Sequence, residues 1–271
     1  PVYYPFFQMI ESNNRQLVTS SLAFKEGRFH INFGDLETKL RDSVKLVLLC
    51  NPHNPGGTVW TKEELEQIGD ICAKYNIPVL SDEIHGDLAL FDNTYTPFAS
   101  ISEKFSETSI TCIAPTKTFN IAGLQAAAIV TPNKEIKSKI DTFIERQGHF
   151  TLNTFGIVGM EASYKDGGPW LQHVKDVIEE NVEDVVSFIQ KELPNLEVYK
   201  PEGTYLVWTD CRKLGLNEEE LKDALLKKGK LALDFGKKFG HEAEGFVRMN
   251  VACSKQTLKE GLRRLKIALG D

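Results

Sequence analysis

The sequence lacks any apolar run that approaches the roughly 20 residues of a membrane-spanning helix. It also lacks an excess of basic residues, since the net charge is −6 and the pI is near 5.6. This balance argues against nucleic acid or an anionic membrane surface as a partner. The 271 residues are 41% hydrophobic and 26% charged, which is typical of a globular protein with one large domain or two ordinary ones.

Cysteine is scarce, and its spacing indicates no metal or redox chemistry. The five cysteines form no C-x-x-C pair and no metal-ligand pattern. Cys50, Cys72 and Cys112 lie in apolar stretches, and we interpret them as reduced core residues. The sequence therefore predicts no metal site and a cytoplasmic location.

Strand and helix patterns alternate through the first half of the chain. Thr61 and Glu64 form a predicted capping box that opens a helix reaching about Tyr75. Apolar runs predict strands at residues 45–50, 77–80, 108–113 and 126–130. This alternation predicts an α/β fold with a mostly parallel sheet sandwiched by helices.

The second half predicts a smaller C-terminal α+β domain, without internal repeats or low-complexity segments. A break at Asp166-Gly167-Gly168 separates a predicted large domain, residues 1–165, from a small domain, residues 166–271. Helices are predicted at 134–146, from about 155, and at 169–193, 218–228 and 255–269. Strands are predicted at 196–200, 205–210 and 245–251.

Three polar residues follow predicted buried strands of the first half. Asn54 lies in the Pro- and Gly-rich turn 51–57, Asp82 follows the next strand, and Lys117 follows the one after. Ligands bind at the carboxyl ends of strands in open α/β sheets, so we expect these side chains to converge. A lysine desolvated in such a cleft has a lowered pKa and can form a covalent bond to a carbonyl carbon.

Each candidate residue also has a structural interpretation. Lys117 could be a surface lysine, and Asp82 and Asn54 could stabilise local turns. Arg248 lies in an alternating stretch, residues 246–250, and a charge among apolar neighbours needs a partner, so a structural salt bridge is the alternative there. Tyr3 could be a core aromatic residue, and His85 could be a structural histidine.

The order Asn54, Asp82, Lys117 and Arg248 resembles the fold-type-I enzymes that use pyridoxal 5′-phosphate, aminotransferase class I/II. The segments Ser81-Asp82-Glu83-Ile84-His85 and Lys117-Thr118-Phe119-Asn120-Ile121-Ala122-Gly123-Leu124 are most similar to one branch. That branch holds the cystathionine β-lyase-like carbon–sulfur lyases related to the maltose-regulon modulator protein. The resemblance extends from Tyr3 to about Leu269.

The resemblance implies that residues 1–165 bind pyridoxal 5′-phosphate. Lys117 would carry the cofactor covalently, and Asp82 would pair with the protonated pyridine nitrogen, which keeps the ring an electron sink. Asn54 and His85 would contact the phenolic oxygen. Glu83 would point away from Asp82, so one of these two acids should be structural.

The resemblance assigns three further contacts. Tyr3 would stack on the pyridine ring, Thr116 would contact the phosphate, and Arg248 would clamp the α-carboxylate of an amino-acid substrate. Two positions depart from the family pattern. Ala114 replaces a common hydroxyl residue, and Gln125 replaces the arginine of many aminotransferases, a replacement that is usual in the lyase branch.

The implied activity is β-elimination from cystathionine or a related S-substituted cysteine, which yields a thiol, pyruvate and ammonia. An aminotransferase is the alternative, and a regulatory binding protein that retains the fold is a further one. The family also implies a homodimer. Because no glycine-rich turn precedes Tyr3, we expect the large domain to be N-terminally incomplete and this chain to hold the cofactor weakly or not at all.

Overall fold

The computed structural model describes residues 1–42, 44–149 and 151–270. Its first half contains a four-stranded sheet in the order β3-β4-β5-β6. The strands are β3 (Val47–Cys50), β4 (Val79–Asp82), β5 (Ser109–Ile113) and β6 (Ala128–Val130). Strands β3, β4 and β5 are mutually parallel, and β6 adds to β5 antiparallel. The predicted mostly parallel sheet is confirmed.

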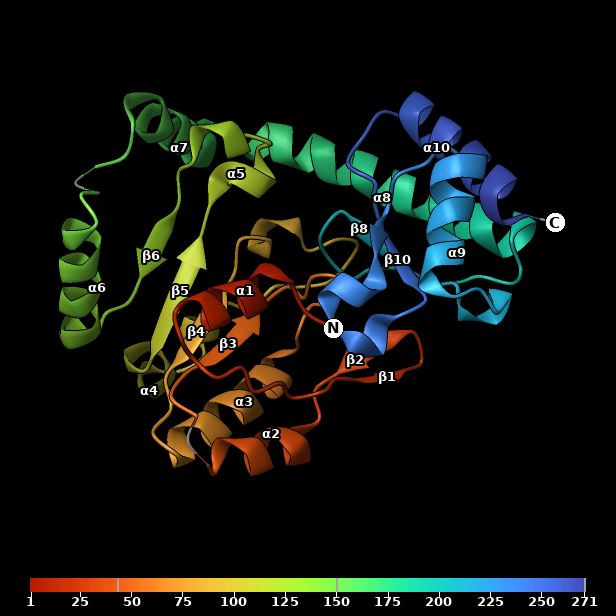
Figure 1. The fold of residues 1–271 in the computed structure, drawn as a ribbon. Coiled ribbons are helices and arrows are strands. Elements are labelled where there is room, and N and C mark those ends of the chain that lie inside the picture. Colours follow the sequence, from red (N-terminus) through yellow and green to blue (C-terminus); the bar gives the residue numbers. More distant parts are fainter. Residues whose placement is uncertain (43, 150, 271) are drawn as a thin grey trace.

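Helices surround this sheet, with α2 and α3 grouped on one side of it in Figure 1. Helix α3 starts from the predicted capping box, in which the Thr61 side chain and Glu64 exchange hydrogen bonds. The helices of this half are α1 (Pro5–Ser12), α2 (Phe33–Leu40), α3 (Lys62–Lys74), α4 (Glu103–Glu107), α5 (Pro115–Thr118), α6 (Lys134–Arg146) and α7 (Thr154–Asp166). A hairpin of β1 (Ala23–Lys25) and β2 (Arg28–His30) also precedes β3.

The second sheet is antiparallel, in the order β7-β8-β10-β9. Its strands are β7 (Glu197–Val198), β8 (Leu206–Asp210), β9 (Asp234–Phe235) and β10 (Phe246–Asn250). Helices α8 (Gly168–Glu192), α9 (Glu218–Asp223) and α10 (Lys255–Leu269) lie beside it (Figure 1). Short 3₁₀ segments occur at Gly86–Leu88, Phe98–Ser100, Ala122–Leu124, Arg212–Leu214, Gly236–Phe239 and His241–Ala243, and a π-helix occurs at Ala224–Lys228.

Apolar periodicity explains why α8 packs against the second sheet. Ile178, Val182, Val185 and Ile189 recur at helical spacing, and all four are buried in one cluster with residues of β8, β10 and α10. A second cluster packs β3 and β4 of the first sheet against α2 and α3, and Trp208 joins this cluster from β8. The two halves of the chain therefore share packing, while the predicted boundary near residue 166 stays a prediction.

Several boundaries differ from those predicted. Strand β6 begins at Ala128 rather than at residue 126, because its partner β5 ends at Ile113, which pairs with Ala128. The helix predicted at 218–228 is α-helical only to Asp223 and continues as a π-helix. Within residues 1–42, 44–149 and 151–270, no helix has both the length and the apolar character that crossing a membrane would require.

Candidate active site

Asp82 ends β4, at the carboxyl edge of the first sheet. Its Oδ1 accepts a hydrogen bond from the Ile84 amide at 3.3 Å. Burial raises the pKa of Asp82 above its ordinary 3.8, and the nearby charge of Glu83 raises it further, against the opposing effects of the Ile84 amide and Lys117. A half-buried acid of this kind favours a cationic partner.

Glu83 is the structural member of the acid pair. Its side chain is buried and accepts hydrogen bonds from the Ser81 hydroxyl at 2.7 Å, from the Phe98 amide at 2.9 Å and from the Tyr95 hydroxyl. Both carboxylate oxygens therefore have partners, which satisfies a group that burial would otherwise penalise. This geometry agrees with the expectation that one of the two acids, Asp82 or Glu83, is structural.

Lys117 lies on the short helix α5, which directly follows β5. The side chain is half-buried, and its positive charge acts on both Asp82 and His85. The amine is therefore close to the acid at the end of the neighbouring strand. Thr116 precedes it and is also half-buried, and its contact with a phosphate stays a prediction.

His85 is buried beside the same edge of the sheet. Its ring meets the Tyr205 ring edge-on, with ring centres 5.5 Å apart. Burial, followed by the charges of Lys117 and Arg248, lowers the pKa of His85 to about 3. Its Nδ1 has no hydrogen-bond partner among the described residues. The site thus contains a neutral imidazole with a free ring nitrogen.

Asn54 and Arg248 come from opposite halves of the chain and meet in the site. The Asn54 side chain is buried, and its Oδ1 accepts a hydrogen bond from Nη1 of Arg248 at 2.7 Å. Arg248 also forms an ion pair with Asp234. The structural salt bridge considered for Arg248 is therefore present, together with a contact to the predicted cofactor site.

Tyr3 lies close to this cluster. Burial raises the pKa of Tyr3, and Tyr4 and Asp82 raise it further while Arg248 acts in the opposite direction. The backbone of the same segment is tied to the C-terminal half, because the Val2 amide donates to the Phe239 carbonyl at 2.9 Å. Tyr3 thus lies within electrostatic range of both the acid and the arginine, and its stacking on a pyridine ring stays a prediction.

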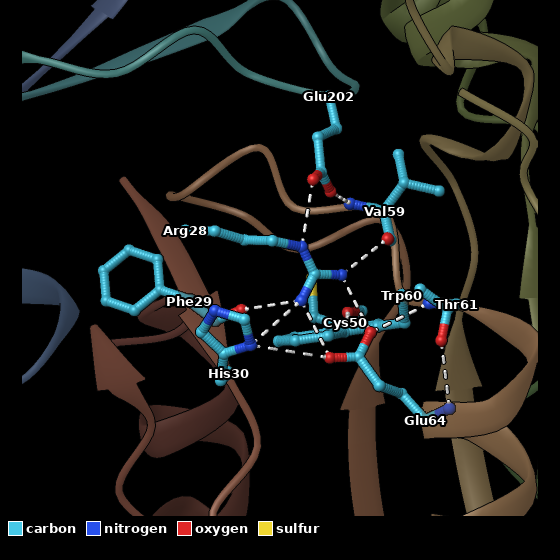
Figure 2. A network of polar contacts seen from close by, with 9 residues as sticks. All are labelled: Arg28, Phe29, His30, Cys50, Val59, Trp60, Thr61, Glu64 and Glu202. Atoms are coloured by element: carbon cyan, nitrogen blue, oxygen red, sulfur yellow. Dashed lines mark hydrogen bonds and ion pairs between the residues drawn. The ribbon is translucent and has the colours of Figure 1, made fainter. Parts of the chain in front are cut away.

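A network around Arg28 holds Val59, which follows the turn 51–57 along the chain (Figure 2). Arg28 donates to both carboxylate oxygens of Glu64 at 2.8 Å, to Glu202 at 2.9 Å and to the Val59 carbonyl at 3.0 Å. Glu202 in turn accepts a hydrogen bond from the Val59 amide at 2.8 Å. The bidentate pair of Arg28 with Glu64 connects the hairpin to helix α3. The Glu202 carboxylate, which accepts from both Arg28 and Val59, connects them to the segment leading into β8.

A glycine allows the same turn to approach the C-terminal half closely. Gly57 has a φ of +70°, and a Cβ there would lie 2.4 Å from the Cβ of Pro201. Its carbonyl accepts hydrogen bonds from the Glu202 and Gly203 amides at 2.9 Å. Only glycine combines this backbone conformation with this contact.

Sequence reasoning missed Asp234 and Tyr205. Asp234 lies in β9, a strand of two residues that carries no recognisable pattern. Tyr205 lies at the start of a predicted strand, but nothing in that pattern indicates contact with His85. Both contacts arise from sheet register and packing rather than from local sequence.

Comparisons with known proteins agree with this arrangement. Residues 1–265 match the family described as Aminotransferase class I and II. The chain is 47% identical over 270 residues to Cystathionine beta-lyase PatB of Bacillus subtilis strain 168, an alignment that covers 99% of this chain and 70% of that protein. It is 30% identical over 267 residues to Protein MalY of Escherichia coli strain K12, covering 98% and 68% of the two chains.

The fold is also similar to a solved structure. Cystalysin from Treponema denticola, whose structure contains a pyridoxal 5′-phosphate cofactor, superposes with a TM-score of 0.97 at 37% sequence identity. The match covers 99% of this chain and 68% of that chain. The similarity therefore includes both sheets and the residues between them.

Proposed function

The chain belongs to the aminotransferase class I and II family, and on that basis we propose that it is a pyridoxal-phosphate-dependent carbon–sulfur β-lyase. The substrate class is cystathionine or a related S-substituted cysteine. The observation that carries the proposal is 47% identity to a cystathionine β-lyase across 99% of the chain. Asn54, Asp82 and Lys117 also lie at or just after the carboxyl ends of the neighbouring strands β3, β4 and β5, which supports the proposal.

The residues of the site fit pyridoxal phosphate. Asp82 has no ion pair with a basic side chain among the described residues and suits the protonated pyridine nitrogen. The unpartnered Nδ1 of His85 and the buried amide of Asn54 suit the phenolic oxygen. Lys117 would hold the carbonyl carbon, Tyr3 would cover the ring, and Thr116 would contact the phosphate.

Pyridoxal phosphate, when bound, supplies an electron sink conjugated to the substrate α-carbon. The chain supplies the remaining functions. Arg248 would bind the α-carboxylate. The substrate amine would replace Lys117 on the carbonyl carbon, and the amine of Lys117 freed in this way would accept the proton that leaves the α-carbon. Asp82 retains a proton on the pyridine nitrogen. The Cβ–S bond breaks with departure of the thiolate, and hydrolysis of the three-carbon fragment yields pyruvate and ammonia.

An aminotransferase would use the same residues up to removal of the α-proton. The exposed Gln125, in place of the arginine of many aminotransferases, favours the lyase by resemblance. A regulatory binding role does not require the amine, acid and arginine to converge. The lyase is therefore the function that this site supports best.

We further propose that the protein is a cytoplasmic homodimer acting on a small amino-acid substrate, with domains at residues 1–165 and 166–271. Several large apolar side chains of α6 and α7 are exposed, including Phe143 at 62%, Phe155 at 76% and Val158 at 59%. Phe155 and Val158 are three positions apart on α7, so their side chains are neighbours on the helix, and neighbouring exposed apolar side chains are characteristic of an interaction surface. Sedimentation equilibrium of the cofactor-loaded protein tests the dimer, and a monomer would contradict it.

The activity is tested with two assays on the cofactor-loaded protein. Pyruvate release from L-cystathionine is measured beside amino transfer from the same substrate to a 2-oxo acid. We expect pyruvate to form without the 2-oxo acid. Dependence of all turnover on the 2-oxo acid would identify an aminotransferase, and cofactor binding without either reaction would favour the regulatory alternative.

A further inference from the structure

Asp234 holds one edge of the Arg248 guanidinium. The register of β9 and β10 places the two residues directly opposite each other. Oδ2 of Asp234 accepts hydrogen bonds from Nε, at 3.1 Å, and from Nη2. The Arg248 side chain is only 14% exposed, and its guanidinium carbon lies 4.7 Å from the centre of the Phe239 ring. A carboxylate thus fixes one edge of the guanidinium while an aromatic ring covers one face.

The remaining hydrogen-bonding capacity of Arg248 matches one further carboxylate. A guanidinium has five N–H groups, one on Nε and two on each terminal nitrogen. Asp234 takes two of these, and Asn54 takes one from Nη1. One N–H therefore remains on each terminal nitrogen among the contacts of the described residues. A carboxylate bound in the fork uses one N–H from each of these two atoms.

Asp234 is ionised in this arrangement. Burial raises its pKa, but the hydrogen bonds and charges of Lys238 and Arg248 outweigh that effect and hold the pKa below the ordinary 3.8. Lys238 pairs with Oδ1, whereas Arg248 binds Oδ2. Each oxygen of the aspartate therefore has its own cationic partner, and Oδ2 remains dedicated to Arg248.

We propose that Asp234 is a positioning residue that makes the site selective for substrates with an α-carboxylate. It orients Arg248 so that the edge between the two terminal nitrogens is directed to the substrate. This inference rests on the proposed function and extends it to the basis of substrate selection. Asp234 acts through Arg248 and does not contact the reacting atoms.

The test uses two probes that differ only in the α-carboxylate, L-methionine and 3-(methylthio)propylamine. Neither has sulfur at the β-carbon, so both report binding rather than elimination. Their dissociation constants are measured by calorimetry on the cofactor-loaded protein, and their inhibition constants are measured against L-cystathionine. Misplacing a substrate-binding group by about 1 Å can cost on the order of a hundredfold. We expect Asp234→Asn to weaken methionine binding about tenfold to a hundredfold and to leave amine binding unchanged.

The matched control is Asp223→Asn, which removes an exposed aspartate paired with Lys227 at 2.7 Å, away from the site. It should change neither constant. Asp234→Glu retains the charge on a longer side chain and should give an intermediate loss for methionine, which keeps the test available if Asp234→Asn fails to fold.

The two hypotheses fail in different ways. The folded variants Asp234→Asn and Asp234→Glu are compared with the protein without substitutions. If their ratio of methionine affinity to amine affinity is the same, Asp234 does not position Arg248. A lowered melting temperature with that ratio unchanged would likewise assign it a purely structural role. If the unaltered protein releases no pyruvate but still prefers methionine, the proposed lyase function fails while carboxylate selection by Arg248 stands.

Discussion

Nη1 of Arg248 donates a hydrogen bond to Oδ1 of Asn54 across 2.7 Å of space and 194 positions of sequence. Asn54 belongs to the turn after β3, and Arg248 belongs to β10 in the other half of the chain. The proposed cofactor-binding and substrate-binding groups are therefore directly coupled. A change at either residue should affect the other.

Lys117 is expected to be the point of covalent attachment for the cofactor. Borohydride reduction of the loaded protein followed by peptide mass mapping should place the label on Lys117 alone, because its charge acts on both Asp82 and His85 at the edge of the sheet. The exposed Lys104, which pairs with Asp70, serves as an internal control and should stay unlabelled. A label on any other lysine would refute the assignment.

Arg248→Ala should raise the KM for amino-acid substrates far more than it disturbs cofactor binding. A lost charge-assisted pair costs about 1.5–3 kcal/mol, which corresponds to about tenfold to a hundredfold in affinity. Steady-state kinetics and cofactor titration on the same preparation separate the two effects. Partial unfolding with unchanged kinetics in the surviving fraction would instead identify Arg248 as a structural ion-pair residue.

Asp82→Asn should weaken cofactor binding and slow turnover, because the amide cannot balance the charge of a protonated pyridine nitrogen. We expect about a tenfold to hundredfold loss of cofactor affinity, the usual cost of a charge-assisted hydrogen bond. Glu83 offers a contrast, since Glu83→Gln removes a buried structural acid and should mainly lower the free energy of unfolding. If Asp82→Asn retains full affinity and rate, Asp82 is not the ring partner.

His85 should make the folded protein sensitive to acid. The folded state keeps His85 neutral down to about pH 3, whereas the unfolded chain takes up a proton near the ordinary pKa of 6.5. Stability contributed by the neutral ring is therefore lost as the pH falls through this window. His85→Gln should reduce the slope of unfolding free energy against pH there by about 1.4 kcal/mol per pH unit, the linkage of one proton.

Chemical denaturation at successive pH values across that window measures the slope. His53 provides an independent replicate, because burial also lowers its pKa to about 3. His53→Gln should therefore produce a similar reduction. An unchanged slope in His85→Gln would show that the folded protein admits a proton to this ring.

Arg28→Met should destabilise the connection between the hairpin, α3 and the segments that carry Val59 and Glu202 (Figure 2). Removing one member of a largely buried ion network leaves its carboxylates uncompensated, at a cost of about 3 kcal/mol. Urea unfolding measures this loss. Arg263→Met, which removes an exposed arginine paired with Glu260, is the control and should have a much smaller effect. Equal effects would mean that the Arg28 network contributes little.

The sequence alone was sufficient to predict the elements whose determinants are local. The capping box at Thr61 and Glu64 and the apolar stripe of α8 follow from short-range hydrogen bonding and helical spacing. The placement of Asn54, Asp82 and Lys117 at one edge of the first sheet followed from their positions at the ends of successive strands, since parallel strands end at the same edge. The chemical role of these residues came from resemblance rather than from spacing.

Only the tertiary structure revealed Asp234 and the link from Asn54 to Arg248. Strand β9 has two residues, too few for a periodic signal, and its register against β10 depends on packing in the second sheet. The low pKa of His85 depends likewise on burial and on charges brought from distant elements. Local hydrogen bonding and periodicity can be predicted from short stretches of sequence, but strand register and electrostatic environment depend on residues far apart in the chain.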